Sequence, residues 1–186
     1  MGREQPGHAV ASPAAVNKGL VVGAVAGLVG TWAMNEAQRL WTHAVDGDVP
    51  PESAGGRHDA RDWQERSEGQ NSNELAAQAI AGRALGRRLT RQELGVAAPV
   101  LHYLFGAAMG AMYGAYSGRE PSRTSGAAFG TTVWLAADEI AMPLFGLSQP
   151  TTRRPLEMHA QAFFAHLVFG AATEMTRRSL QLHFER

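Results

Sequence analysis

The fold is decided by residues Val96 to Gly118, which read VAAPVLHYLFGAAMGAMYGAYSG. The stretch contains no Lys, Arg, Asp or Glu, and His102 is its one group that titrates near neutral pH. A helix needs about 20 mainly apolar residues to cross about 30 Å of hydrocarbon. This segment is therefore long and apolar enough to span a membrane.

Three other segments have the same character. They cover residues 19–35, 125–147 and 158–175, and Asp138 and Glu139 interrupt the second of these. The mean hydropathy of the whole chain is slightly negative, which would suit a soluble helical bundle. The polar residues, however, are concentrated outside the four segments, which are hydrophobic nearly all round rather than along one stripe. The pattern favours a membrane protein.

A signal peptide is the alternative for the first segment, since Lys18 precedes an apolar run. That run is longer than the usual apolar region of about 7 to 15 residues, and no clean A-x-A site precedes Glu36. We therefore expect this segment to be a retained anchor.

Composition excludes several classes of function. The chain has 186 residues, no cysteine and a formal net charge of zero. There is thus no disulfide framework, no thiolate metal site and no electrostatic case for nucleic-acid binding. Neither a phosphate-binding P-loop nor a G-x-S-x-G nucleophile motif is present. No cofactor is predicted, and an enzyme is the less favoured reading.

The polar segments define the expected organisation. Residues 1–17 form a predicted mobile tail, residues 18–180 a single four-span membrane domain, and residues 181–186 a C-terminal tail. Within the domain, residues 39–95 contain a polar loop and then an amphipathic helix from Glu74 to Arg88, with Ser72 and Asn73 as N-cap candidates. This helix lies either on the membrane surface or, as we favour, on the end of the bundle.

The turn before the second span carries its own signal. Thr90 and Glu93 have the spacing of a capping box, which predicts that a new helix starts there.

Glycines recur at a spacing of four within the apolar segments. This spacing places them on one helix face, where missing side chains let two backbones approach closely. The partner helix belongs either to the same chain or to a second copy in a homo-oligomer. The predicted packing residues are Gly23, Gly27, Gly106, Gly110, Gly114 and Gly130.

The ionisable residues of the spans fall at one depth. Alternate spans run in opposite directions, so position converts to depth at about 1.5 Å per residue. All the groups then lie in the half of the membrane nearest residues 39–95, and we expect both termini on the opposite side. The predicted polar cluster contains Glu36, His102, Asp138, Glu139, His159 and His166.

The cluster admits several roles. His159 and His166 are seven residues apart and share a helix face, whereas Asp138 and Glu139 point about 100° apart, so one of the two acids should face the histidines. Pro143 cannot donate to the carbonyl of Glu139, which leaves an acceptor beside the acids. Charged groups at bilayer depth normally pair, face the interior or mark a pathway. A satisfied structural cluster, a proton or ion pathway, a metal site and catalysis all remain open, although no H-x-x-x-H or E-x-x-H spacing supports a metal.

Three runs resemble the YagU-like inner-membrane proteins of bacteria, a family catalogued as a domain of unknown function. They are HYLFGAAMGAMYG from His102, FGTTVWLAADEIAMPLFGLSQP from Phe129 and AHLVFGAATEMTRR from Ala165. The resemblance implies a multi-pass protein of the bacterial inner membrane and marks His102, Asp138, Glu139, His166 and Glu174. His159 matches the family pattern least.

The sequence therefore predicts an all-α integral membrane bundle of four transmembrane helices, with an amphipathic interfacial helix before the second span. The leading functional class is a protein that responds to protons or small ions, concerned with acid stress. The rival class is a scaffold that assembles through its glycine faces. In either class the lipid bilayer is the expected partner.

Overall fold

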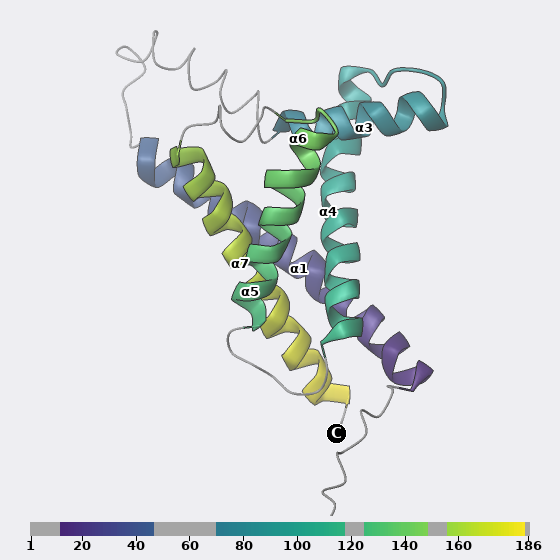
Figure 1. Cartoon of the computed structure of the whole chain (residues 1–186), viewed down its shortest axis with the longest axis vertical. Helices are drawn as coiled ribbons and strands as arrows, with labels where there is room; N and C mark the ends of the chain where they lie inside the picture. Colours follow the sequence, from purple (N-terminus) through teal and green to yellow (C-terminus); the bar gives the residue numbers. More distant parts are fainter. Residues whose placement is uncertain (1–11, 47–69, 118–124, 149–155, 185–186) are drawn as a thin grey trace, which may run out of the picture.

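The computed structural model describes residues 12–46, 70–117, 125–148 and 156–184, and every regular element in these ranges is a helix (Figure 1). The all-helical prediction is confirmed for these residues. The predicted loop falls largely on residues 47–69, outside the described part. The elements are α1 (Pro13–Asp46), α3 (Gln70–Ala84), α4 (Arg91–Tyr116), α5 (Ser125–Val133), the π-helix η2 (Trp134–Ala141), α6 (Met142–Leu144) and α7 (Leu156–Phe184).

Two of these helices, α1 and α4, are long and apolar enough to cross a membrane by length and composition. They pack antiparallel to each other, and α5 packs antiparallel to α7. The chain thus runs up α1, down α4, up through α5, η2 and α6, and down α7 (Figure 1). The start of α1 and the end of α7 lie at the same end of the molecule, opposite α3.

Several helix boundaries differ from the expected ones. Helix α1 begins at Pro13, inside the predicted tail, and α7 continues past residue 180 to Phe184. Helix α3 begins at Gln70 rather than Glu74, so the two expected caps at residues 72–73 lie inside its first turn. It ends at Ala84 because Gly86 adopts the left-handed conformation, with φ of 66°.

The predicted capping box at the start of α4 is confirmed. The side chain of Thr90 accepts from the amide of Glu93 at 3.3 Å, and the Glu93 carboxylate accepts from the amide of Thr90 at 2.8 Å. Arg87 donates to both oxygens of the same carboxylate, at 2.6 and 2.9 Å. These hydrogen bonds raise the pKa of Arg87 and tie the α3–α4 turn to the first turn of α4.

Glycines form the contact between α1 and α4. A Cβ atom built on Gly23 would fall on the backbone of Gly110, and one built on Gly27 would fall on that of Gly106. Towards the start of α1, a Cβ atom on Gly19 would lie 2.5 Å from the carbonyl oxygen of Gly114. The two backbones are therefore in direct contact over three turns, with no room for any side chain between them.

The second glycine contact joins α5 to α7. A Cβ atom on Gly126 would lie 2.9 Å from the carbonyl oxygen of Gly170, and one on Gly130 would fall on the carbonyl of His166. Gly126 belongs, with Gly130, to the glycines at a spacing of four that the sequence marked, whereas Gly170 was not predicted although the close approach needs it.

The hydrophobic core lies where the two helix pairs meet. Met34 of α1, Val133 of α5, and Ala165 and Phe169 of α7 are buried together. Phe129 stacks on Tyr113 of α4 with ring centroids 4.2 Å apart, which joins α4 to the same core. These contacts fix the distance between η2 and α7, and so they position the candidate site.

The glycine contact gives a direct test with a matched control on the same helix. Gly110→Ala should destabilise the folded protein by about 1 to 3 kcal/mol, because the new methyl group meets backbone that cannot move aside. Gly95→Ala should be neutral or stabilising by up to about 1 kcal/mol, because nothing lies within 4 Å of its added Cβ. Thermal unfolding in a mild detergent measures both, and equal effects would show that the contact does not form.

A histidine and carboxylate cluster as candidate functional site

The candidate site is built on the π-helix η2, which carries two adjacent acids. The amide of Met142 donates to the carbonyl five residues earlier, whereas that of Phe145 donates to the carbonyl four residues earlier, at 3.0 Å. The carbonyls of residues 138–140 lie between these two acceptors. Pro143 has no N–H, so the amide of Leu144 is the one donor at helical spacing for these three carbonyls.

In an α-helix, Pro143 would leave the carbonyl of Glu139 as the one acceptor without a donor. The π-helix differs, because three carbonyls there face a single amide. A π-helix is wider and less regular than an α-helix, and such segments occur often at functional sites. Here it redirects the side chains of Asp138 and Glu139, which start from adjacent positions.

Both acids face α7, on different turns. Glu139 Oε1 lies 2.9 Å from His159 Nδ1, and these side chains are 7% and 17% exposed. Asp138 Oδ2 lies 3.7 Å from His166 Nδ1, an electrostatic contact longer than a direct hydrogen bond. The expectation that one acid at most would face the histidines is therefore wrong: the antiparallel packing of η2 on α7 gives each acid its own histidine.

The tautomer of His166 follows from its main-chain contact. Its Nδ1 lies 2.8 Å from the carbonyl oxygen of Ala162, and a carbonyl can only accept, so Nδ1 carries the hydrogen. In the neutral ring Nε2 is then the basic atom. His166 also interacts electrostatically with His102 of α4, which brings a third helix to the site.

The remaining predicted member, Glu36, lies at the edge. Its carboxylate pairs with Arg39 one turn along α1 at 2.9 Å, and both side chains are exposed to solvent, by 38% and 71%. On the same helix, Asn35 donates to the hydroxyl of Tyr103 at 3.4 Å, next to His102 in the chain. Helix α1 thus reaches the site through Asn35, while Glu36 makes a surface ion pair.

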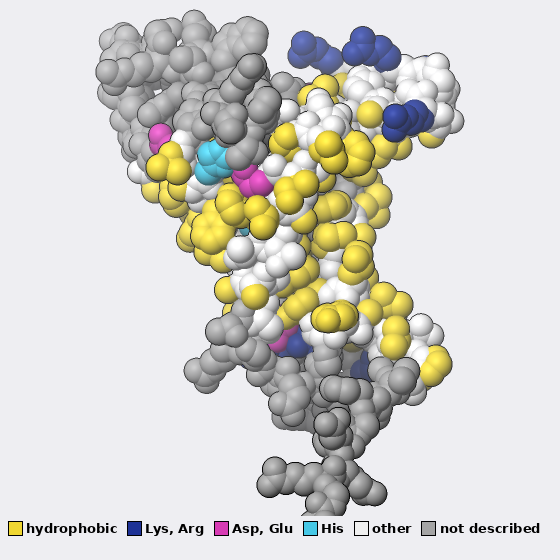
Figure 2. Space-filling view, viewed as in Figure 1, with side chains coloured by type: hydrophobic (Ala, Val, Ile, Leu, Met, Phe, Trp, Pro, Cys, Tyr) yellow, Lys and Arg dark blue, Asp and Glu magenta, His cyan; other side chains and the backbone are white. Residues whose placement is uncertain are grey.

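An aromatic pair joins the same two helices that carry the acids and two of the histidines. Trp134 packs edge-on against Phe163, with centroids 5.0 Å apart, and its indole nitrogen is buried without a hydrogen-bond partner. Figure 2 shows a histidine and acidic side chains near the end of the molecule that carries α3, above a broad band of hydrophobic side chains. Within the described residues, no group of three or more His, Cys, Asp or Glu side chains could hold a metal ion.

A second buried charge cluster lies on α7, towards the opposite end. Arg177 donates to both oxygens of Glu174, at 2.7 and 2.9 Å, and also to Gln181 at 3.0 Å. Its guanidinium lies over the ring of Tyr113, 5.6 Å from the centroid, and Arg178 is a further partner of the same carboxylate. Sequence reasoning marked Glu174 by resemblance alone, although the E-x-x-R-R spacing, with partners three and four residues along, predicts this pairing.

A comparison with known proteins finds a family match over the region that contains most of these residues. Residues 86–175 match the family model described as "Protein of unknown function (DUF1440)". This part of the chain, just under half of its length, is similar to the DUF1440 family. The match is consistent with the YagU-like resemblance. No curated protein and no solved structure matches the chain.

The DUF1440 region covers α4, α5, η2, α6 and most of α7. It contains both acids of η2, the three histidines of the cluster and Glu174, but not α1 or Arg177. The helices that carry the histidine and carboxylate cluster are thus common to the family model, whereas the glycine partner of α4 lies outside it.

Two Glu–Arg pairs of the same spacing, one buried and one exposed, allow a controlled test in this protein. Glu174→Ala should cost about 3 to 5 kcal/mol, because it leaves the guanidinium of Arg177 buried without its counter-charge. Glu36→Ala should cost less than about 1 kcal/mol, because its pair with Arg39 is exposed. Thermal unfolding in detergent compares them, and a small effect of Glu174→Ala would show that the buried pair is open to water.

Proposed function

We propose that this protein is a multi-pass integral protein of the bacterial inner membrane, in which the histidine and carboxylate cluster between η2 and α7 binds and exchanges protons. The observation that carries the proposal is the 2.9 Å contact between Glu139 and His159. The proposed setting is the response to acid stress.

The exposed surface supports the membrane part of the proposal. In the apolar window of α4 just 17% of the residues are buried inside the molecule, so this helix is not the core helix of a soluble bundle. Large apolar side chains such as Leu104, Met112, Val21 and Trp32 are between 57% and 66% exposed. Figure 2 shows these residue types as a continuous band between charged ends. Such a surface is unfavourable in water and favourable in lipid.

The other two proposed spans contain the polar groups. Helices α5, η2 and α6 follow one another without a gap from Ser125 to Leu144, and α7 extends over 29 residues. Each acid described in η2 and in the buried cluster of α7 has a histidine or an arginine nearby: Glu139 with His159, Asp138 with His166, and Glu174 with Arg177. Pairing of this kind is what makes an ionisable group tolerable at membrane depth.

The chemistry of the cluster supports proton exchange. An imidazole and a carboxylate in hydrogen-bond contact share one proton, which resides on the nitrogen or on the oxygen depending on pH and solvation. Asp138 and His166 lie in a longer electrostatic contact, at 3.7 Å, farther along α7, and His102 adds a third imidazole on α4. The five side chains thus offer proton sites on three helices.

The rival proposals find less support. A scaffold assembled through glycine faces needs those faces at the surface, but Gly23, Gly27, Gly106, Gly110 and Gly114 are buried within the chain. An intramembrane metalloenzyme needs at least three converging ligands, and the described residues offer no such group.

The experiment that tests the proposal is infrared difference spectroscopy on the reconstituted protein during a pH step. We expect a band from a carboxyl group whose protonation state changes with the pH step. Glu139→Gln should remove that band. His159→Gln should change the frequency of that band, because the carboxyl group of Glu139 loses its contact with the imidazole of His159.

Glu157→Gln is the matched control, since Glu157 is an exposed acid on the same helix two residues from His159. It should leave the band unchanged. A spectrum without a buried carboxyl band, or a band that survives Glu139→Gln, would contradict the proposal.

A further inference from the structure

An apolar groove lies where α3 crosses the first half of α4, away from the histidine and carboxylate cluster. Its volume is about 380 Å³, and both helices line it with apolar side chains, including Ile80, Ala84 and Leu85 of α3 and Ala97, Val100 and Leu104 of α4. Ile80, Leu85 and Leu104 are between 53% and 61% exposed, so nothing described in the chain covers the groove. Helix α3 itself is held on α4 by the buried Ala77 and Ala81.

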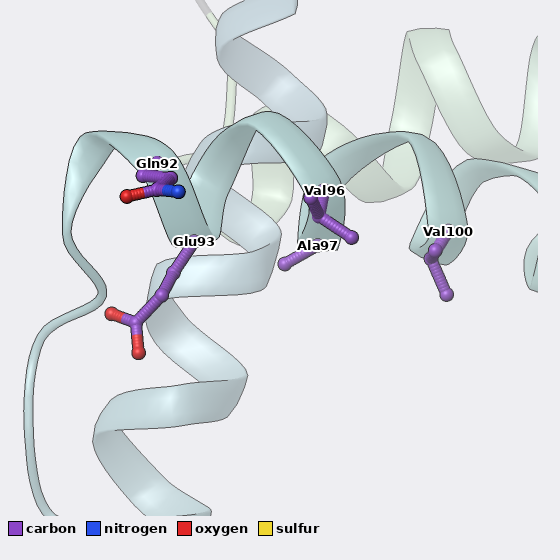
Figure 3. A pocket seen from close by; sticks show the side chains of 5 residues that line it. All are labelled: Gln92, Glu93, Val96, Ala97 and Val100. Atoms are coloured by element: carbon purple, nitrogen blue, oxygen red, sulfur yellow. The ribbon is translucent and has the colours of Figure 1, made fainter.

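A second hollow continues the groove towards the start of α4. It is lined by Gln92, Glu93, Val96, Ala97 and Val100, so it shares its last two residues with the groove. Figure 3 shows Glu93, Val96, Ala97 and Val100 pointing to the same side of the helix. The combined groove is thus polar at one end and apolar along the rest, as an amphiphile requires.

A cluster of arginines adjoins the polar end, whose own lining is Gln92 and Glu93. Arg83, Arg87, Arg88 and Arg91 lie within nine residues at the end of α3 and the turn into α4, and all four are exposed. Arg87 is paired with Glu93, and no ion pair is described for the other three. Figure 2 shows Lys and Arg side chains on the outer side of α3 and hydrophobic side chains beneath them. This arrangement suits a helix lying flat at the lipid headgroups.

We propose that this groove binds an anionic glycerophospholipid, with its phosphate among the arginines of the α3–α4 turn and an acyl chain along Val96, Val100 and Leu104. These three residues are spaced by four and form one stripe down α4, 51% to 65% exposed. The excess of arginine over acid selects an anionic headgroup rather than a zwitterionic one. The inference needs the membrane location of the protein but not the proton-binding role of Glu139.

The test is native mass spectrometry of the full chain with phosphatidylglycerol or phosphatidylcholine added to detergent micelles. The wild-type protein should retain phosphatidylglycerol preferentially. Arg83→Gln combined with Arg88→Gln should reduce that preference about tenfold or more. Lys18→Gln combined with Arg39→Gln removes the same charge from α1 and should leave it unchanged.

A groove-filling variant tests the apolar part separately. Ala84→Phe, at an exposed lining position that should tolerate a larger side chain, should reduce retention of phosphatidylglycerol while the helical circular dichroism stays the same. Equal retention of both lipids by the wild-type protein would overturn the proposal in favour of non-specific surrounding lipid. Displacement of the lipid by inorganic phosphate would overturn it in favour of a phosphate site, and an equal loss in the α1 control would show that net charge alone decides.

Discussion

The structure depends on the direct backbone contact between α1 and α4. Three glycines of α1 oppose three of α4. A Cβ atom added to any of them would fall on the partner's backbone, except at Gly106, where it would fall on the side chain of Thr31. In lipid there is no hydrophobic effect to drive helices together, so close approach, with its dispersion contacts and weak Cα–H···O bonds, has to hold the pair. Because both helices expose large apolar side chains elsewhere, the glycine face decides which sides meet and which face lipid.

The second glycine contact, between α5 and α7, positions the histidine and carboxylate cluster. Gly126 and Gly130 bring α5 against α7, and η2 continues from α5 towards its own partners on α7. The change to π register and the lack of an amide at Pro143 then separate the side chains of Asp138 and Glu139 onto two turns of α7. Paired acids and histidines can be buried between these helices because each offsets the cost of burying the other.

The sequence predicted what depends on local chemistry. Apolar length, the capping box at Thr90 and the small-residue face of α4 are each properties of one segment, and the helices start from them. The sequence could not show which glycine-bearing helix packs on which, because α1, α4 and α5 all carry glycines at a spacing of four. Nor could the sequence place Glu139 on His159, because that contact depends on the π register of residues 134–141 and on the packing of η2 against α7. His159 also fitted the family pattern least.

The central claim, an antiparallel α1–α4 pair within one chain, is tested most directly by electron spin resonance distances between two labels. The chain has no cysteine, so pairs introduced at exposed positions are labelled cleanly. Val21 with Met112 should give a clearly shorter distance than Val21 with Val96, because the two α4 positions are about 24 Å apart along the helix. Dilution with unlabelled protein should leave both distances unchanged. The reverse order, or a short distance that disappears on dilution, would contradict the account.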